Sequence, residues 1–323
     1  MKNLGHRRPL FKHCCLGRGF FCWGNEAIFK AMQLFKDGFF CRETGSSKKI
    51  KLRTKQEESK MKKTFLNLTL TILIALGLIA VSKDAVAETL FGDYLKEKGI
   101  DVEVSASMDF YSKYVWRGFL LDDDCVLQPG FTISAAGFEG GFWGSWDVDA
   151  NDSLNSDEVD GWISYNFDLG FIDEALEIVG LSVGNTWYDF PGADLYTKEL
   201  YIGITLDTLL SPYFTWYHDY GEEASGGADG NYYAIGAGHS FDLVENYGIT
   251  LDIGSEVGFN DGAFIAGDGG YYLATLGITV PLTETLTMSP CLGYSVPFGD
   301  LEDSADGNQH EQFYGGVSLA FRF

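Results

Sequence analysis

Short segments in which apolar and polar residues alternate recur from about residue 100 to the end of the chain. The last of them, residues 316–323 (GVSLAFRF), has apolar side chains at Val317, Leu319, Phe321 and Phe323. A two-residue period is that of a β-strand with one apolar and one polar face. No stretch after residue 88 sustains the 3.6-residue period of a helix. The pattern therefore predicts an all-β fold.

We count about twelve such segments, each about 9 to 12 residues long, which is the length that a tilted strand needs to cross a bilayer. Strands of soluble proteins average about 5 to 6 residues. The first alternating segment starts at residue 100, and the last is the terminal one. The ten segments between them lie near residues 127–136, 138–148, 159–167, 178–188, 199–207, 212–220, 231–241, 248–258, 271–280 and 285–296. We predict a transmembrane antiparallel up-and-down β-barrel. For the terminal segment alone, an edge strand of a soluble sandwich is the alternative.

The connections between segments also alternate in length. Those after odd-numbered segments are long and acidic, as in residues 147–160, 221–231 and 299–312, whereas those after even-numbered segments are short. Residues 169–177 (LGFIDEALE) are longer than the other even connections, and we expect a helical turn there. Membrane barrels have short periplasmic turns and longer outer loops. Because lipid offers no hydrogen-bond partner, the last strand must pair with the first, with both ends of the barrel chain in the periplasm.

The charge divides the chain near residue 87. Of the 23 Lys and Arg, 17 lie in residues 1–87, whereas only 6 of the 46 Asp and Glu do. The later part therefore has 6 basic and 40 acidic side chains, which argues against binding to nucleic acid. Its aromatic and branched residues are too dense for a disordered acidic chain.

Residues 61–87 have the features of a secretory signal peptide. Two lysines follow Met61, an apolar stretch runs from residue 65 to residue 81, and Ala85-Val86-Ala87 forms an A-x-A cleavage site. We expect cleavage near Ala87, export to the bacterial outer membrane and a mature barrel of residues 88–323. A membrane anchor is the alternative, but the stretch is short for a spanning helix. Residues 1–60 are predicted to be a mis-annotated upstream extension; a genuine long leader is the alternative.

Near the end of the first segment stands SKYVWRG, followed by an acidic turn and LQPGFTIS. This region resembles the opening signature of the TorF-type outer-membrane porin family, whose S-x-Y-x-x-RG core is matched by Ser112, Tyr114, Arg117 and Gly118. The resemblance implies an outer-membrane barrel with pore activity. The terminal aromatics, Phe321 and Phe323, resemble the signal read by the barrel assembly machinery. For Arg117 we favour a structural role, paired with an acidic residue at the rim.

With the apolar faces toward lipid, the lumen is predicted to be acidic. The pore-lining candidates are Asp101, Glu103, Asp109, Glu139, Asp147, Asp160, Asp252, Glu256 and Arg322. We expect Glu103 and Asp252 to form the constriction and Arg322 to be paired. Aromatics near segment ends, among them Tyr111, Tyr114 and Trp116, are predicted to form interfacial girdles.

The sequence predicts a porin for passive diffusion of small hydrophilic solutes, with a preference for cations. A solute-specific channel for nucleosides or sugars is an alternative, with inward Trp143, Trp162, Tyr188 and Tyr201 as stacking faces, and a non-conducting structural or adaptor barrel is another. Inward glycines such as Gly184 either leave room in the lumen or serve strand curvature.

We expect no enzymatic activity, because His239 and Ser240 are adjacent in a strand and point to opposite faces. We also expect no metal or other cofactor, since the mature chain has no phosphate-binding loop and no paired CxxC motif. A disulfide between Cys125 and Cys291 is left open.

Overall fold

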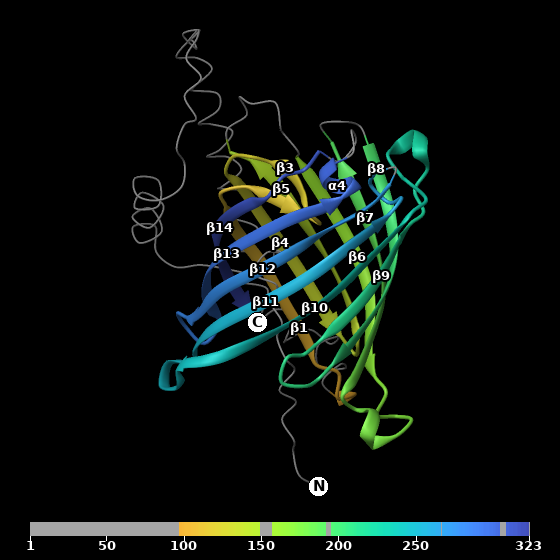
Figure 1. The fold of residues 1–323 in the computed structure, drawn as a ribbon. Helices are drawn as coiled ribbons and strands as arrows, with labels where there is room; N and C mark the ends of the chain where they lie inside the picture. Colours follow the sequence, from red (N-terminus) through yellow and green to blue (C-terminus); the bar gives the residue numbers. More distant parts are fainter. Residues whose placement is uncertain (1–96, 149–156, 192–194, 266, 304–307, 323) are drawn as a thin grey trace, which may run out of the picture. The chain divides into compact units, whose positions relative to one another are not determined.

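A computed structural model describes residues 97–148, 157–191, 195–265, 267–303 and 308–322. The predicted extension, the signal peptide and Phe323 lie outside these residues. Twelve antiparallel strands form a closed barrel in which neighbours in sequence are neighbours in space (Figure 1). The strands are β1 (Val102–Tyr111), β4 (Val126–Ala135), β5 (Phe138–Asp147), β6 (Glu158–Asp168), β7 (Val179–Phe190), β8 (Leu195–Leu206), β9 (Tyr213–Asp219), β10 (Asn231–Val244), β11 (Ile249–Asp261), β12 (Asp268–Pro281), β13 (Leu286–Gly299) and β14 (Gln312–Arg322).

The first and last strands close the barrel, as predicted. β1 and β14 are antiparallel, with Met108 opposite Leu319 and Phe110 opposite Val317. β1 pairs with β4 along its other edge. The barrel sheet therefore has no free edge, and its backbone groups are paired without help from the surroundings.

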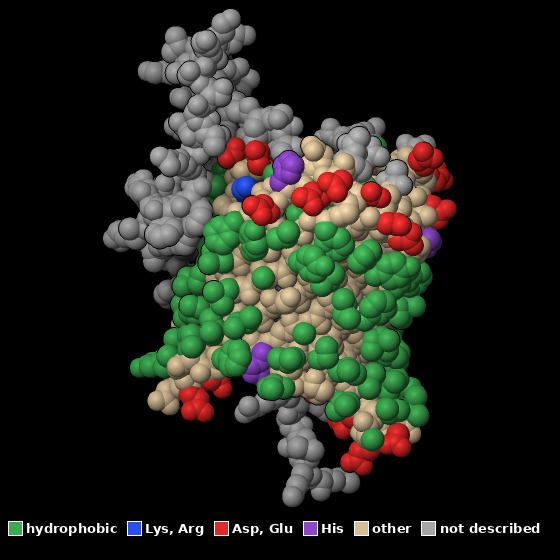
Figure 2. Space-filling model, viewed as in Figure 1, with side chains coloured by type: hydrophobic (Ala, Val, Ile, Leu, Met, Phe, Trp, Pro, Cys, Tyr) green, Lys and Arg blue, Asp and Glu red, His purple; other side chains and the backbone are tan. Residues whose placement is uncertain are grey.

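Large apolar side chains cover the outside of the barrel. Ile163, Ile202, Ile235, Ile253 and Leu276 lie on five different strands, and each is more than 40% exposed. Figure 2 shows hydrophobic side chains in a broad band over the wall, with acidic side chains beyond the band at both ends. This is the surface that a membrane-spanning barrel requires. Among the described residues, no helix has both the length and the apolar character needed to cross a membrane.

Short connections gather at one end of the barrel, which we call the short-turn end; the other is the long-loop end. Between β4 and β5 the turn consists of Ala136 and Gly137, both with positive φ (51° and 88°), as in a type I′ hairpin. The predicted helical turn between β6 and β7 is confirmed as a short 3₁₀ helix, η1 (Glu174–Leu176). Two further 3₁₀ turns, η2 (Glu223–Ser225) and η3 (Glu245–Tyr247), follow β9 and β10.

Several inward aromatic rings pack closely against glycines of a neighbouring strand. A Cβ atom added at Gly184 would lie 2.5 Å from the ring of Tyr201, and one at Gly236 would lie 2.5 Å from the ring of Tyr213. Trp162 and Tyr314 cover Gly141 and Gly293 in the same way. These glycines leave space for an aromatic ring of the neighbouring strand, so they do not leave that space to a solute.

Closure can be tested by cross-linking in a background whose other cysteines are replaced by serine. We expect the pair Met108→Cys and Leu319→Cys to form a disulfide on oxidation, because directly opposed residues bring their Cβ atoms to about 4.5–5.5 Å. The control pair, Met108→Cys and Phe321→Cys, is two residues out of register and should cross-link far less. Mass spectrometry of peptides measures both. Equal cross-linking of the two pairs would contradict the register.

A hairpin folded into the barrel lumen

The connection between β1 and β4 forms a second, two-stranded sheet of β2 (Tyr114–Trp116) and β3 (Phe119–Asp122). We call residues 114–122 the lumen hairpin. Its turn consists of Arg117 and Gly118, whose φ angles of 48° and 84° fit a type I′ turn. Positive φ is costly for most residues but not for glycine, which accounts for Gly118 of the motif, whereas Arg117 takes a positive φ without that freedom. The family-like motif therefore builds the tip of a hairpin.

Ser112 ends the pairing of β1 before the chain leaves the wall. Its backbone N–H donates to the Gly315 carbonyl at 2.9 Å, and its Oγ accepts from the Gly315 N–H at 3.1 Å. The next residue, Lys113, donates from Nζ to Gln312 Oε1 at 2.7 Å. These bonds to β14 hold the base of the hairpin at the long-loop end.

Tyr114 fixes the hairpin to the wall beside β5 and β6. Its hydroxyl donates to Glu158 Oε2 at 2.8 Å, and its ring centroid lies 5.5 Å from that of Trp143. The Tyr114 side chain is buried, and burial, followed by the nearby charge of Glu158, raises the pKa of its hydroxyl well above the ordinary value. Tyr114 therefore remains a neutral hydrogen-bond donor.

Arg117 crosses to the far side of the barrel and binds Glu199 on β8. Two bonds join the groups: Nη1 to Oε1 at 2.6 Å and Nη2 to Oε2 at 3.0 Å. The side chains are only 9% and 0% exposed. Burial by itself lowers the pKa of Arg117, but the adjacent Glu199 carboxylate raises it, and the resulting pKa lies well above its ordinary value. Tyr188 donates a third bond to the carboxylate, at 2.6 Å.

Aromatic rings surround the guanidinium. Its central carbon lies 4.5 Å from the ring centroid of Trp116, 4.2 Å from that of Tyr217 and 4.1 Å from that of Tyr232. At such distances a cation is attracted by the ring faces. We call the group formed by Trp116, Tyr188, Glu199, Tyr217 and Tyr232 the Arg117 cage.

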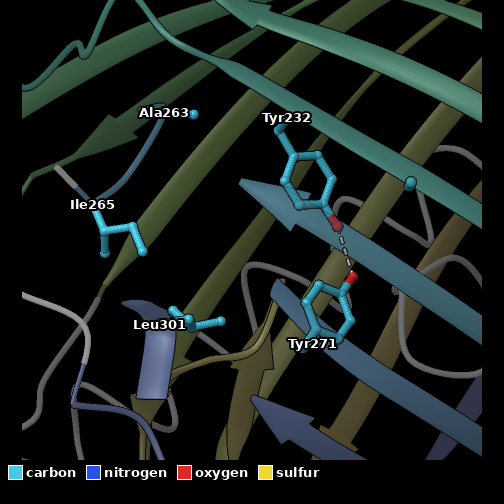
Figure 3. Packing of buried hydrophobic residues seen from close by; sticks show 6 residues of the cluster. Tyr232, Ala263, Ile265, Tyr271 and Leu301 are labelled. Carbon is cyan, nitrogen blue, oxygen red and sulfur yellow. Dashed lines mark hydrogen bonds between the residues drawn. The ribbon is translucent and has the colours of Figure 1, made fainter. Parts of the chain in front are cut away.

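An apolar cluster fills the space next to the tip. Tyr232, Ala234, Ala263, Ile265, Tyr271 and Leu301 are buried together, and Phe119 of the hairpin packs against them. Figure 3 shows the hydrogen bond between the hydroxyls of Tyr232 and Tyr271, whose oxygens are 2.8 Å apart. Ile265 and Leu301 reach the cluster from other segments. Leu301 belongs to the short helix α4 (Asp300–Asp303), and Ile265 to the connection after β11. We call these six residues the plug cluster.

The turn glycine is required by this close packing. A Cβ atom added at Gly118 would lie 2.7 Å from Leu301 Cδ2 and 2.9 Å from Tyr271 Cβ. On the far side of the hairpin, the Leu120 N–H donates to Gln309 Oε1 at 2.9 Å. The lumen hairpin is thus held by the wall and by the connection between β13 and β14.

The structure separates the predicted pore-lining residues into three groups. Asp109 and Asp160 are buried in the lumen toward the long-loop end. Three others accept side-chain hydrogen bonds. Glu139 accepts one from Trp162, and Asp252 accepts bonds from Thr250 and Thr279. Glu256 accepts bonds from Tyr213 and Tyr271. Asp101 precedes β1 and is exposed, and Asp147 is the last residue of β5.

Arg322 is paired, as expected, with Glu103 at 2.9 Å. Both side chains are nearly half exposed, at 42% and 49%. Glu103 and Asp252, expected to form a constriction at mid-strand height, lie within the first four residues of β1 and β11, at the short-turn end. The lumen hairpin enters from the opposite end.

Three sequence-based interpretations are corrected. Arg117 pairs with an acid, but inside the lumen and not at the rim. Tyr111, Tyr114 and Trp116 face inward and do not join an interfacial girdle, since Tyr111 and Tyr114 are buried around Cys291 and Trp116 packs against them. Trp143 and Tyr188, proposed as stacking faces for a solute, contact Tyr114 and Trp116.

The sequence reasoning missed Glu158 and Glu199, the two carboxylates that hold the hairpin. Both lie at alternate positions whose side chains point inward. Glu158, however, lies just before the expected segment 159–167, and Glu199 is the first residue of the expected segment 199–207. The open question of a Cys125–Cys291 bridge is also answered. Cys291 keeps its thiol, which donates to the Tyr111 hydroxyl at 3.6 Å. In the described part of the chain, no three His, Cys, Asp or Glu side chains are grouped to hold a metal ion.

Breaking the buried pair should cost far more stability than breaking the exposed one. We expect Arg117→Ala to lower the free energy of unfolding by about 3–5 kcal/mol, because it leaves the Glu199 carboxylate buried and unpaired. Adding Glu199→Gln should restore part of this loss, which a double-mutant cycle measures. The control, Arg322→Ala, removes an exposed pair and should cost less than about 1 kcal/mol. Equal losses for the two arginine variants would contradict the burial.

No protein-family model matches the chain, and no curated protein matches its sequence. Similar solved structures include the KdgM porin (11% identity, TM-score 0.44, covering 67% of this chain and 99% of that one). A NanC porin structure has 10% identity, a TM-score of 0.41 and coverage of 68% and 99%. The COG4313 outer membrane channel from Pseudomonas putida F1 has 10% identity, a TM-score of 0.37 and coverage of 69% and 94%. Membership of the TorF-type family stays a prediction.

Proposed function

We propose that this protein is a channel of the bacterial outer membrane through which small hydrophilic solutes diffuse passively. The observation that carries the proposal is the closed barrel, apolar outside and with charged and polar side chains inside. Such a barrel places its outer surface in lipid and encloses a polar lumen. The predicted signal peptide supports export, and the short-turn end would then face the periplasm.

The lumen hairpin forms the narrowest part of the proposed path. It enters from the long-loop end, crosses the lumen and meets the plug cluster. Toward the short-turn end the inward side chains are smaller and polar, as at Thr132, Ser164 and Ser289. We therefore infer that the outer half of the barrel determines which solutes pass. A barrel of twelve strands is itself intermediate between those filled by side chains and those that hold a wide channel.

Cations are the favoured solutes in this proposal. Glu139, Asp252 and Glu256 face the lumen and are only partly buried, and a further five carboxylates are buried in the long-loop half: Asp109, Glu158, Asp160, Glu199 and Asp219. Arg117 is the basic side chain placed among them, and it neutralises one of these carboxylates. A lumen lined by acidic groups attracts cations and repels anions.

A non-conducting structural or adaptor barrel is the second candidate, and the plug cluster is the observation that favours it. Six buried residues and the side chains packed against them form a hydrophobic cluster next to the hairpin tip, as a filled lumen would require. The two functions differ in what happens when the hairpin is removed. A channel narrowed by a hairpin should then conduct more, whereas a scaffold filled by several connections should remain closed.

Planar-bilayer recordings of the refolded barrel separate these functions. We expect small, stable current steps and, under a KCl gradient, a reversal potential of the sign given by cation flow. Replacing residues 114–121 by a short Gly-Ser linker should increase the conductance, because the hairpin no longer crosses the lumen. A matched control shortens the connection between β6 and β7 at the short-turn end. If neither the unmodified barrel nor the variant without the hairpin conducts after insertion, the result would support the scaffold. A preference for anions would contradict the acidic lumen.

A further inference from the structure

We propose that the wall of the Arg117 cage is a binding site for solutes that carry a guanidinium or alkylammonium group, and that Arg117 occupies this site as an internal stand-in for such a solute. The inference names the solute class for the proposed channel, and its role in transport rests on that function. The site itself can exist whether or not the barrel conducts.

The binding groups of the site belong to the barrel wall. Tyr188, Glu199, Tyr217 and Tyr232 come from β7, β8, β9 and β10, four strands that are neighbours in the sheet. Only Trp116 of the cage, and Phe264 at 5.5 Å from the guanidinium carbon, come from connections. The backbone ladders between the four strands hold the wall residues in place without the hairpin.

The chemistry of these groups selects a planar cation. Glu199 offers two carboxylate oxygens, and Arg117 uses both, at 2.6 and 3.0 Å. Tyr217 and Tyr232 offer ring faces about equally far from the cation, at 4.2 and 4.1 Å. A guanidinium fits this combination because it is flat, weakly hydrated and able to donate two parallel hydrogen bonds. Sodium ions are compact and strongly hydrated, and they would gain less.

Because Glu199 is buried, a solute that moves Arg117 away must put its own positive charge beside the Glu199 carboxylate. The Glu199 side chain is fully buried, and a carboxylate left there without a cation is strongly disfavoured. Tyr188 keeps its bond to Oε2 in either case, so the carboxylate stays oriented. A cationic solute that takes the place of the guanidinium removes this penalty, and the tip of the hairpin is then released from the wall.

The test uses the refolded full barrel with Arg117→Ala, which empties the site, and isothermal titration with agmatine and methylguanidine. We expect saturable binding of both. The control ligand is urea, which resembles guanidinium in shape but carries no charge, and it should not bind. Adding Glu199→Gln to the same protein should weaken the binding by about tenfold or more, equivalent to about 1.4 kcal/mol.

Absence of binding to a folded Arg117→Ala barrel, or binding that is unchanged by Glu199→Gln, would overturn the proposal. If Arg117→Ala does not fold, the variant with residues 114–121 replaced by a linker also lacks Arg117 and should bind the same ligands. Conductance of the unmodified protein is measured separately, in KCl and in agmatine. Binding without conductance would support this site and refute the channel, whereas conductance without any binding would support the channel and refute the site.

Discussion

Backbone hydrogen bonding in lipid is the constraint on which the rest of this structure depends. A strand edge in a bilayer has no partner, so the sheet must close, and β14 returns to pair with β1. Closure places one face of every strand in lipid and the other in an enclosed lumen. The apolar band and the polar interior are two consequences of the same alternation.

A closed lumen also gives the chain a place to bury a connection. The lumen hairpin is polar at its tip and apolar on its flanks, so it needs both kinds of partner. Glu199 and the cage rings bind the tip, while the plug cluster packs against Phe119. The three connections that meet here come from β1, β11 and β13, strands that all end at the long-loop end. The hairpin is therefore as much a part of the interior as the wall residues are.

The barrel could be predicted closely from the sequence because its signal is repeated in every strand. The period of two, the strand lengths and the alternating connections all specify the same architecture, and the predicted pairing of the first and last strands is confirmed. The contents of the lumen could not be predicted in this way. A contact between Arg117 and Glu199 joins residues 82 positions apart, and no local pattern encodes it. Tyr114 and Trp116 looked like interfacial aromatics because proximity to a strand end does not reveal whether the chain then turns inward.

The central claim is that the connection after β1 lies inside the barrel, and photo-cross-linking tests it most directly. A benzophenone side chain introduced at Phe119 should form cross-links to the segment that contains Phe264, whose ring lies 6.1 Å away, and to Tyr271 or Leu301. Mass spectrometry of the linked peptides identifies the partners. Cross-links found only to lipid or to partners outside the protein would place the hairpin outside the lumen and contradict the account.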